Sequence, residues 1–221
     1  QLQNNVSWAT GKYGGALEFD GVDDFVLIPD DNSLHLPNSM SIAFWAKLET
    51  GTAHSRPVSF NDDSIDVYFE DSDSQNTERR IRSYIIEDGT STRYYADNIE
   101  RVPGQTVNTG SWIHVAFTYD GTTIKQYQNG ELIVQDNWTG NIRTGVTHYI
   151  GRRGAGNYWV GLLDEVALWD NALDQNEINS IYGSGIESGL LGIPQVPEIS
   201  AKFIPIFGML IWLFAILTNR K

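Results

Sequence analysis

Short stretches that alternate apolar and polar residues recur along residues 1 to 170. The clearest is Ser41–Leu48, whose alternation suits a strand with one buried face. Phe25–Ile28 stops at a proline and Trp112–Tyr119 stops at an Asp-Gly pair, which are two common ways to end a strand. Asn129-Gly130, inside the run from Ile124 to Val134, is a strong signal for a tight hairpin turn. The pattern predicts a chain of antiparallel hairpins, and therefore an all-β fold.

One short helix is expected after these strands. Asp170 or Asn171 can cap its start. Its apolar face would consist of Leu173, Ile178 and Ile181. The composition agrees with the rest of the pattern, since 21 glycines and 12% aromatic residues are typical of many short strands joined by tight turns.

The C-terminal part of the chain departs from this pattern. From Phe203 to Thr218 sixteen residues carry no charge, and they lie between Lys202 and the basic pair Arg220-Lys221. A helix of this length spans roughly 24 Å, short of the ~30 Å of a bilayer core, and lysine and arginine side chains can snorkel to cover the difference. A buried core helix is the alternative, but it would have a polar face, which this run lacks. We therefore predict one transmembrane helix over residues 201–221, after a Gly/Pro-rich linker at 184–200.

The flanking charges predict how this helix is oriented. Four residues mark the span itself: Phe203, Gly208, Trp212 and Phe214. Gly208 is a small residue that lets another helix approach closely. Since positive charge stays on the cytoplasmic side, Arg220 and Lys221 predict a cytoplasmic C-terminus and a periplasmic or extracellular N-terminal domain. The chain begins at Gln1 without a basic and apolar leader, so we expect that a signal peptide has been removed or that upstream residues are missing.

Charge narrows the range of partners. The chain carries a net charge of −13, and its last 23 residues contain three basic residues and no acid, so the N-terminal domain is more acidic than the whole. An acidic surface repels nucleic-acid phosphates, which argues against a nucleic-acid partner, whereas cations and basic protein surfaces suit it. The absence of cysteine excludes disulfides and thiolate metal sites.

Four ordered motifs are similar to those of laminin-G-like jelly rolls in the concanavalin A-like superfamily. They are Gly11–Gly21, Trp112–Ala116, Tyr119–Gly130 and Gly161–Ile178, the last of which resembles the closing strand and short helix of pentraxins. The resemblance implies a two-sheet antiparallel jelly-roll sandwich over residues 1–183. Val196-Pro197-Glu198 and the apolar run after it resemble the PEP-C-terminal sorting signals of bacteria, which implies a bacterial source.

The resemblance also implies where catalytic carboxylates would lie. Glycoside hydrolases of this superfamily place acids at alternate positions of one strand, so that they flank a sugar bond from one face. The stretch Glu70-Asp71-Ser72-Asp73 comes nearest to that pattern, but it lies among Ser, Gln and Asn residues that indicate a loop, and no further acid continues the series. The four histidines have no spacing typical of a metal site. We therefore predict that the chain is not an enzyme.

Calcium is the cofactor that the acidic loops suggest, because it prefers six to eight oxygen ligands. By the resemblance, Asp20 and Asp164 lie near each other and would share one structural calcium. Alternatively, Asp20 caps its turn and Asp164 pairs with an arginine or a backbone amide. Asp62 and Asp63 stand where pentraxins carry their first calcium ligands, but the second pentraxin loop is replaced here by a stretch that starts with Arg152-Arg153, whose charge repels the ion. Asp62 and Asp63 are therefore the weaker candidates.

Exposed aromatic residues are the remaining candidates for binding a glycan or a protein. Five lie in turn-rich stretches: Tyr94, Tyr95, Trp138, Tyr158 and Trp159. Half-buried packing under loops is the alternative for each of them. Two functions remain: a non-catalytic accessory subunit whose helix packs against other integral membrane proteins in the bilayer, or a surface lectin or adhesion module that binds glycan or matrix. The incomplete set of pentraxin ligands favours the accessory subunit.

Overall fold

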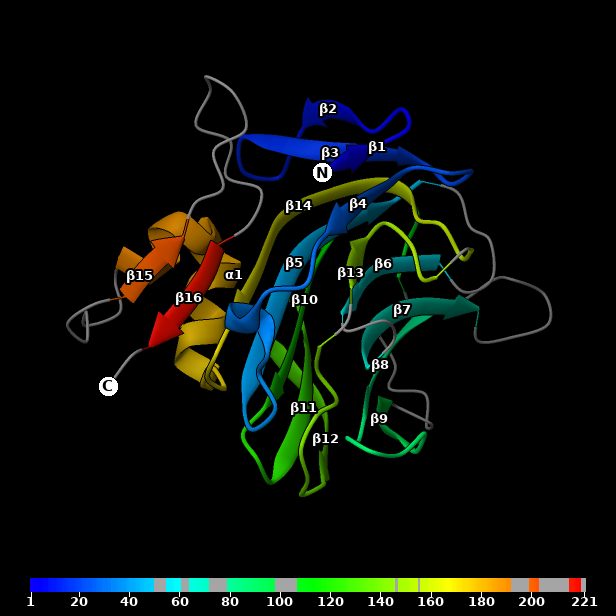
Figure 1. Cartoon of the computed structure of the whole chain (residues 1–221). Coiled ribbons are helices and arrows are strands. Elements are labelled where there is room, and N and C mark those ends of the chain that lie inside the picture. Colours follow the sequence, from blue (N-terminus) through cyan, green and yellow to red (C-terminus); the bar gives the residue numbers. More distant parts are fainter. Residues whose placement is uncertain are drawn as a thin grey trace.

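Tight turns divide the chain into short strands, as a computed structural model shows (Figure 1). Positive φ angles occur in the turns at Gly21, at Gly121 and at Asn129-Gly130, and these are the angles that glycine and asparagine tolerate best. The hairpin predicted at Asn129-Gly130 is confirmed. The structure describes residues 1–49, 55–60, 64–71, 79–97, 107–145, 147–154, 156–191, 199–202 and 215–219.

The strands of this described part form two sheets. The seven-stranded sheet has the order β1 (Leu2–Gln3), β4 (Phe25–Ile28), β13 (His148–Ile150), β6 (Ser55–Phe60), β7 (Ile65–Asp71), β8 (Arg79–Ile86) and β9 (Arg93–Asp97). The nine-stranded sheet has the order β12 (Glu131–Asn137), β11 (Thr123–Gln128), β10 (Trp112–Tyr119), β5 (Met40–Leu48), β14 (Val160–Trp169), β16 (Ala215–Asn219) and β15 (Ile199–Lys202), with β3 (Gly15–Asp20) beside β14 and β2 (Ser7–Thr10) beside β3. Every pair is antiparallel except β14 with β16, which confirms the predicted antiparallel sandwich.

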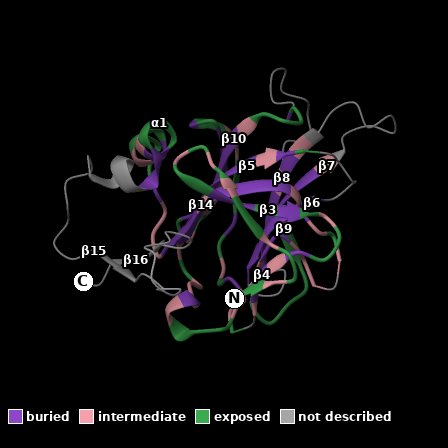
Figure 2. Cartoon of the chain, turned by 90° about the horizontal axis from the view of Figure 1, so that it is seen from above, coloured by how far each residue is buried: buried purple, intermediate pink, exposed green. Residues whose placement is uncertain are grey.

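One large apolar core lies between the sheets. The seven-stranded sheet contributes Val67, Phe69 and Ile85, and the nine-stranded sheet contributes Phe44 and Phe117, among others. Figure 2 shows that the buried segments run along the strands of both sheets. Since alternate residues of a strand point to opposite faces, these core residues also define which side chains point outward.

The outer face of the nine-stranded sheet is covered by α1 (Gln175–Leu191). Ile178 and Ile181 of this helix pack against Ala43 of β5 and Trp169 of β14, as the predicted apolar face requires. The alternation of β5 predicted a strand with one exposed face, but nearly all residues of β5 are buried, because α1 covers that face.

The helix differs from the prediction at both ends. Its cap is Asp174, not Asp170 or Asn171: Oδ1 of Asp174 accepts the backbone N–H of Glu177 at 2.9 Å, and Oε2 of Glu177 accepts the backbone N–H of Asp174 at 2.7 Å. This reciprocal pair is a capping box, which satisfies two donors at once. The helix bends at Gly185, with φ of 77°, and it continues to Leu191, past residue 183 where the sandwich domain was expected to end.

The C-terminal segment is described only in part. Ile199–Lys202 and Ala215–Asn219 form the strands β15 and β16, and β16 pairs with Ala167–Trp169 of β14. The structure therefore differs from the predicted helix of residues 201–221 at residues 201–202 and 215–219. The remaining candidates for the membrane span, namely Phe203, Gly208, Trp212, Phe214, Arg220 and Lys221, lie outside the described residues. Among the helices of the described part, none is both long enough and apolar enough to cross a bilayer.

Candidate functional site

Aromatic and arginine side chains share the outer face of the seven-stranded sheet. Val67 and Phe69 of β7 point into the core, so Asp66, Tyr68 and Glu70 point away from it. On β8, the Ser83 hydroxyl donates at 2.7 Å to Gln126 of the opposite sheet, which places its neighbours Arg82 and Tyr84 on the outer side. We call this surface the arginine–tyrosine face, and define it by Arg56, Tyr68, Arg80, Arg82, Tyr84, Arg93 and Tyr95.

Tyrosine rings form the floor of the arginine–tyrosine face. Tyr84 lies edge-on to Tyr68, with ring centroids 6.1 Å apart, and edge-on to Tyr95, with centroids 5.3 Å apart. Tyr68 and Tyr84 are buried, and burial raises the pKa of Tyr68 to about 12. Tyr68 therefore stays neutral at physiological pH, and Tyr95 is the half-buried ring at the edge of this aromatic layer.

Guanidinium groups lie over these rings. Arg56 lies 3.8 Å from the centroid of Tyr68, Arg82 lies 4.8 Å from that of Tyr95, and Arg93 lies 5.2 Å from that of Tyr84. Each arrangement is within the range of a cation–π contact. Arg56 is buried within this aromatic layer, Arg82 is half-buried and Arg93 is exposed.

Two carboxylates hold three arginines of this face in place, namely Arg56, Arg80 and Arg82. Asp66 forms a buried ion pair with Arg56 on the neighbouring strand. Oε2 of Glu70 accepts hydrogen bonds from Arg80 at 3.1 Å and from Arg82 at 3.0 Å. Burial alone raises the pKa of Glu70, but the hydrogen bonds and charges of Arg82 and Arg80 outweigh it and leave this pKa below its ordinary value. Glu70 was predicted to lie in a loop; it lies at the end of β7 instead, because opposite charges pair across the strands.

A second contact of the same kind lies farther along this sheet. The Arg152 guanidinium lies 3.6 Å from the centroid of Phe25 on β4 and 4.4 Å from that of Tyr149 on β13. Ladder partners connect the two regions in one row: Tyr149 with Ser59, Ser59 with Asp66, Asp66 with Tyr84, and Tyr84 with Tyr95. Arginine and aromatic residues therefore recur across the outer side of the whole sheet.

Of the five aromatic residues proposed from the sequence, Tyr95 lies on the arginine–tyrosine face. Trp138 is only 7% exposed, and it packs against Tyr94 and Tyr119 at the edge of the core. Trp159 is fully buried against Phe69. Tyr158 is half-buried in the loop before β14. The packing alternative therefore holds for Trp138 and Trp159.

Sequence reasoning missed Tyr68, Tyr84 and Arg56. A signal for them was present, because the outward residues of Ile65–Asp71 and Arg79–Ile86 alternate with apolar core residues. That alternation shows which residues share a face, but not which residues of other strands lie beside them.

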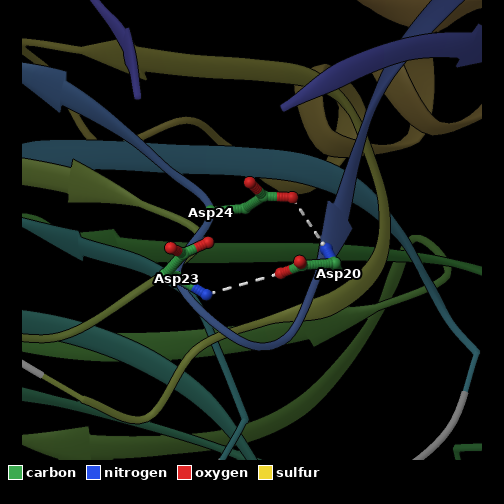
Figure 3. A group of neighbouring side chains, drawn as sticks. All are labelled: Asp20, Asp23 and Asp24. Atoms are coloured by element: carbon green, nitrogen blue, oxygen red, sulfur yellow. Dashed lines mark hydrogen bonds between the residues drawn. The ribbon is translucent and has the colours of Figure 1, made fainter. Parts of the chain in front are cut away.

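The predicted calcium ligand Asp20 lies in a different acidic group. Oxygen atoms of Asp20, Asp23 and Asp24 lie within 4.8 Å of one another in the turn between β3 and β4 (Figure 3). Asp20 caps this turn, since its Oδ1 accepts the backbone N–H of Val22 at 2.8 Å. Asp24 accepts two backbone N–H groups, from Asn5 at 2.8 Å and from Asp20 at 3.0 Å. The group of acids thus has a structural role in the turn.

The structure does not bring Asp164 to this turn. Asp20 pairs in the ladder with Val160, which is four residues before Asp164 on β14, or about 13 Å along the strand. Asp164 instead accepts the backbone N–H of Tyr13 at 2.9 Å, and burial raises its pKa more than such hydrogen bonds lower it. Pairing with a backbone amide is therefore the outcome for Asp164. Asp62 and Asp63 lie outside the described residues.

Solved structures share this fold. Domain 4 of AbnA, a GH43 extracellular arabinanase from Geobacillus stearothermophilus solved with arabinotriose, has a TM-score of 0.62 and 22% identity over 81% of this chain and 82% of that domain. The binding domain of Paraclostridial Mosquitocidal Protein 1 has a TM-score of 0.66 and 13% identity, over 83% of this chain and 47% of that domain. The heptameric SAP-like pentraxin from Limulus polyphemus has a TM-score of 0.51 and 15% identity, over 76% of this chain and 86% of the pentraxin.

Sequence comparison agrees with the fold. No curated protein matches this chain. The family model described as the concanavalin A-like lectin/glucanases superfamily matches residues 20–179, which include every strand of the seven-stranded sheet except β1. On this match, together with the two-sheet sandwich, the chain belongs to the concanavalin A-like lectin/glucanases superfamily.

Proposed function

We propose that this chain is a carbohydrate-binding module that binds glycan on the arginine–tyrosine face and catalyses no reaction. The observation that carries the proposal is the group of tyrosines and guanidiniums packed together across β6 to β9, of which Arg80, Arg82, Arg93 and Tyr95 are partly or fully exposed. A glycan presents apolar C–H faces and many hydroxyl groups, and such a surface offers aromatic area together with fixed hydrogen-bond donors. A solved domain of similar fold, that of the arabinanase, is bound to arabinotriose.

The carboxylates of the same face argue against glycoside hydrolysis. Asp66 and Glu70 lie on one side of β7, four residues or about 13 Å apart, whereas the two acids of a glycosidase lie roughly 5 to 9.5 Å apart. One of the two acids must also be protonated at working pH, which requires a raised pKa. Glu70 has a lowered pKa, and Asp66 is paired with Arg56. Both groups therefore serve to hold arginines.

Glycan-array binding followed by calorimetry tests this function. The Tyr95→Ala variant removes a half-buried ring from the edge strand β9, and we expect it to weaken glycan binding about tenfold. The control is Trp8→Ala, which removes a 46% exposed ring from β2 of the other sheet and should leave binding unchanged. Absence of glycan binding, or the opposite ranking of the two variants, contradicts the proposal. Variants of Trp138 or Trp159 would instead change the core.

The C-terminal sequence favours a second function in addition. The sixteen uncharged residues from Phe203 to Thr218, followed by Arg220-Lys221, support a membrane anchor that places the sandwich outside the cytoplasm, in the periplasm or beyond the cell. In this proposal the chain is an accessory subunit beside other integral membrane proteins of a bacterium. Gentle detergent extraction should then copurify a defined set of membrane proteins. A sample that purifies alone contradicts the accessory role without affecting glycan binding.

Calcium binding at the turn of Asp20 also stays a proposal. Asp20 remains a candidate ligand, with Asp23 and Asp24 in place of Asp164. If a calcium ion binds there, adding calcium raises the melting temperature and a chelator reverses the effect, because a ligand of the folded state stabilises it. The Asp23→Asn variant should abolish this response, and an unchanged melting temperature in the wild type excludes the ion.

A further inference from the structure

Two histidines and one carboxylate meet beside the end of β13. Nε2 of His35 lies 2.8 Å from Oδ1 of Asp30, and Nε2 of His148 lies 3.8 Å from the same oxygen. The two histidines are far apart in the sequence, so their spacing does not indicate a metal site, and the fold brings them to one carboxylate. Imidazole nitrogens and carboxylate oxygens are the atoms that bind zinc in a protein without cysteine.

The strands and the turn after β4 fix this arrangement. His148, the first residue of β13, pairs in the ladder with Ile28, the last residue of β4, which places Asp30 close beside it. The 3₁₀ helix η1 (Asn32–Leu34) then turns the chain, and its last residue is buried in the core. His35 is the C-cap of this helix, so the turn brings its side chain back to Asp30. Sheet pairing and one buried turn therefore hold the three side chains together.

The distances to Asp30 suit a tetrahedral metal ion. Zinc binds nitrogen and oxygen at about 2.0 to 2.2 Å, so two ligand atoms of a tetrahedral site lie about 3.4 Å apart. The distance of Asp30 from His148 is about 0.4 Å longer than this value, and its distance from His35 is about 0.6 Å shorter. The two Nε2 atoms are farther from each other than from Asp30. The side chain of His35 is 28% exposed, so a rotation of this side chain can close that distance.

The buried histidine of this group is in the form that binds metals. His148 is fully buried, its ring packs 5.1 Å from that of Phe60, and burial lowers its pKa to about 4. The imidazole is therefore neutral at neutral pH, and metal ions bind neutral imidazole. The Asp30 side chain is 38% exposed, so an ion can reach the group from solvent past Asp30 and His35.

We propose that Asp30, His35 and His148 bind one zinc ion. On binding, the ion takes the place of the proton that joins His35 to Asp30, and that proton passes to solvent. The bound ion then fastens the turn after β4 to the start of β13. This site is separate from glycan binding on the arginine–tyrosine face. It is also separate from the turn of Asp20, because the whole of β4 lies between that turn and Asp30.

Calorimetric titration of the full chain with zinc chloride tests this inference. The protein is kept in detergent, carries no histidine tag and is freed of metal with a chelator beforehand. We expect one zinc ion per chain with a dissociation constant of about 10 µM or lower, release of a proton and a higher melting temperature. In NMR spectra of the imidazole rings, zinc should shift the signals of His35 and His148 and leave those of His114 in place. Absence of binding at about 100 µM zinc, or an unchanged His148 signal, overturns the proposal.

Matched variants connect the zinc ion to these ligands. We expect Asp30→Asn and His35→Gln each to weaken zinc binding about tenfold or more, and both side chains are partly exposed, so the variants should keep the fold. The controls are Asp23→Asn, which removes an acid from the turn between β3 and β4, and His114→Phe, which removes a histidine from the other sheet. Both controls should bind zinc as the wild type does. Full zinc affinity in Asp30→Asn and His35→Gln, or loss of binding in Asp23→Asn instead, contradicts the site, whereas glycan binding stands or falls by its own test.

Discussion

His114 is a titratable side chain buried on the outer face of the nine-stranded sheet. Its ring lies 5.3 Å from the Trp45 ring on the neighbouring strand and 5.8 Å from that of Tyr182 in α1. Among the described residues, its Nδ1 atom has no hydrogen-bond partner. Burial lowers the pKa of His114 to about 3, so the ring is neutral in the folded protein at neutral and mildly acidic pH.

This shift predicts a loss of stability in acid. Between the ordinary pKa of about 6.5 and the folded value, the unfolded chain binds a proton that the folded chain does not, so the free energy of unfolding falls as pH decreases. Between these two pKa values, one such histidine lowers the free energy of unfolding by about 1.4 kcal/mol for each unit by which the pH falls. The His114→Phe variant keeps an aromatic ring and removes this titration. We expect its stability relative to wild type to rise by about 2 kcal/mol between pH 7 and pH 5, measured by chemical denaturation.

Other titrating groups are present in the wild type and in His114→Phe alike, so their contributions cancel in that comparison. Burial also lowers the pKa of His148, to about 4, and this gives the variant a residual slope of the same sign. Burial raises the pKa of Asp164, which favours the folded state at low pH and opposes the histidines. Parallel stability curves for wild type and His114→Phe would contradict the assignment to His114.

At the scale of the element, the sequence predicts best those strands whose own pattern is strong. The strands β5 and β10 and the hairpin of β11 with β12 appear where alternation and turn residues placed them. The cap of α1 was predicted wrongly because several residues before the helix can serve as caps, and only Asp174 has Glu177 three residues later.

The candidate site was less predictable than the fold, for a physical reason. Whether Asp66 and Glu70 are solvated acids or partners of arginines depends on the register of β6, β7 and β8. That register follows from packing across the whole sheet, and no local sequence pattern contains it. Tyr94 and Tyr95 illustrate the same limit, since one faces the core edge and its neighbour faces outward.

The strand β14 lies between β3 and β5. At Gly161 the backbones of β14 and β5 come so close together that no side chain fits between them. The φ of Gly161 is +125°, and a Cβ added there would overlap the carbonyl oxygen of Lys47 on β5. We expect Gly161→Ala to lower the free energy of unfolding by roughly 2 to 4 kcal/mol, because both the backbone angle and the contact oppose it. Gly15→Ala on β3 is the matched control, since the nearest atom is 3.7 Å away on the Trp8 ring. Thermal melting of both variants should show a drop for Gly161→Ala alone, and equal drops would contradict this reason.

At the scale of the whole molecule, the two outer faces of the sandwich differ. The helix α1 covers part of the nine-stranded sheet with apolar contacts, whereas the seven-stranded sheet presents arginines and tyrosines. This difference between the two outer faces connects the fold to the proposed carbohydrate-binding function.

The C-terminal segment is either a membrane anchor or a part of the sandwich. Truncation of the chain distinguishes these two possibilities. If Phe203 to Thr218 anchors the chain, a variant that ends before Ala201 leaves the membrane fraction and keeps the melting temperature of the sandwich. If the segment belongs to the sandwich, as the pairing of β16 with Ala167–Trp169 of β14 describes for residues 215–219, the same variant melts at a lower temperature and its fractionation does not change. We expect the first result. Exposing sixteen uncharged residues to water costs more free energy than two short strands added at the edge of a sheet can offset. Sedimentation of membranes and melting of the purified variant, measured on the same preparations, distinguish the two.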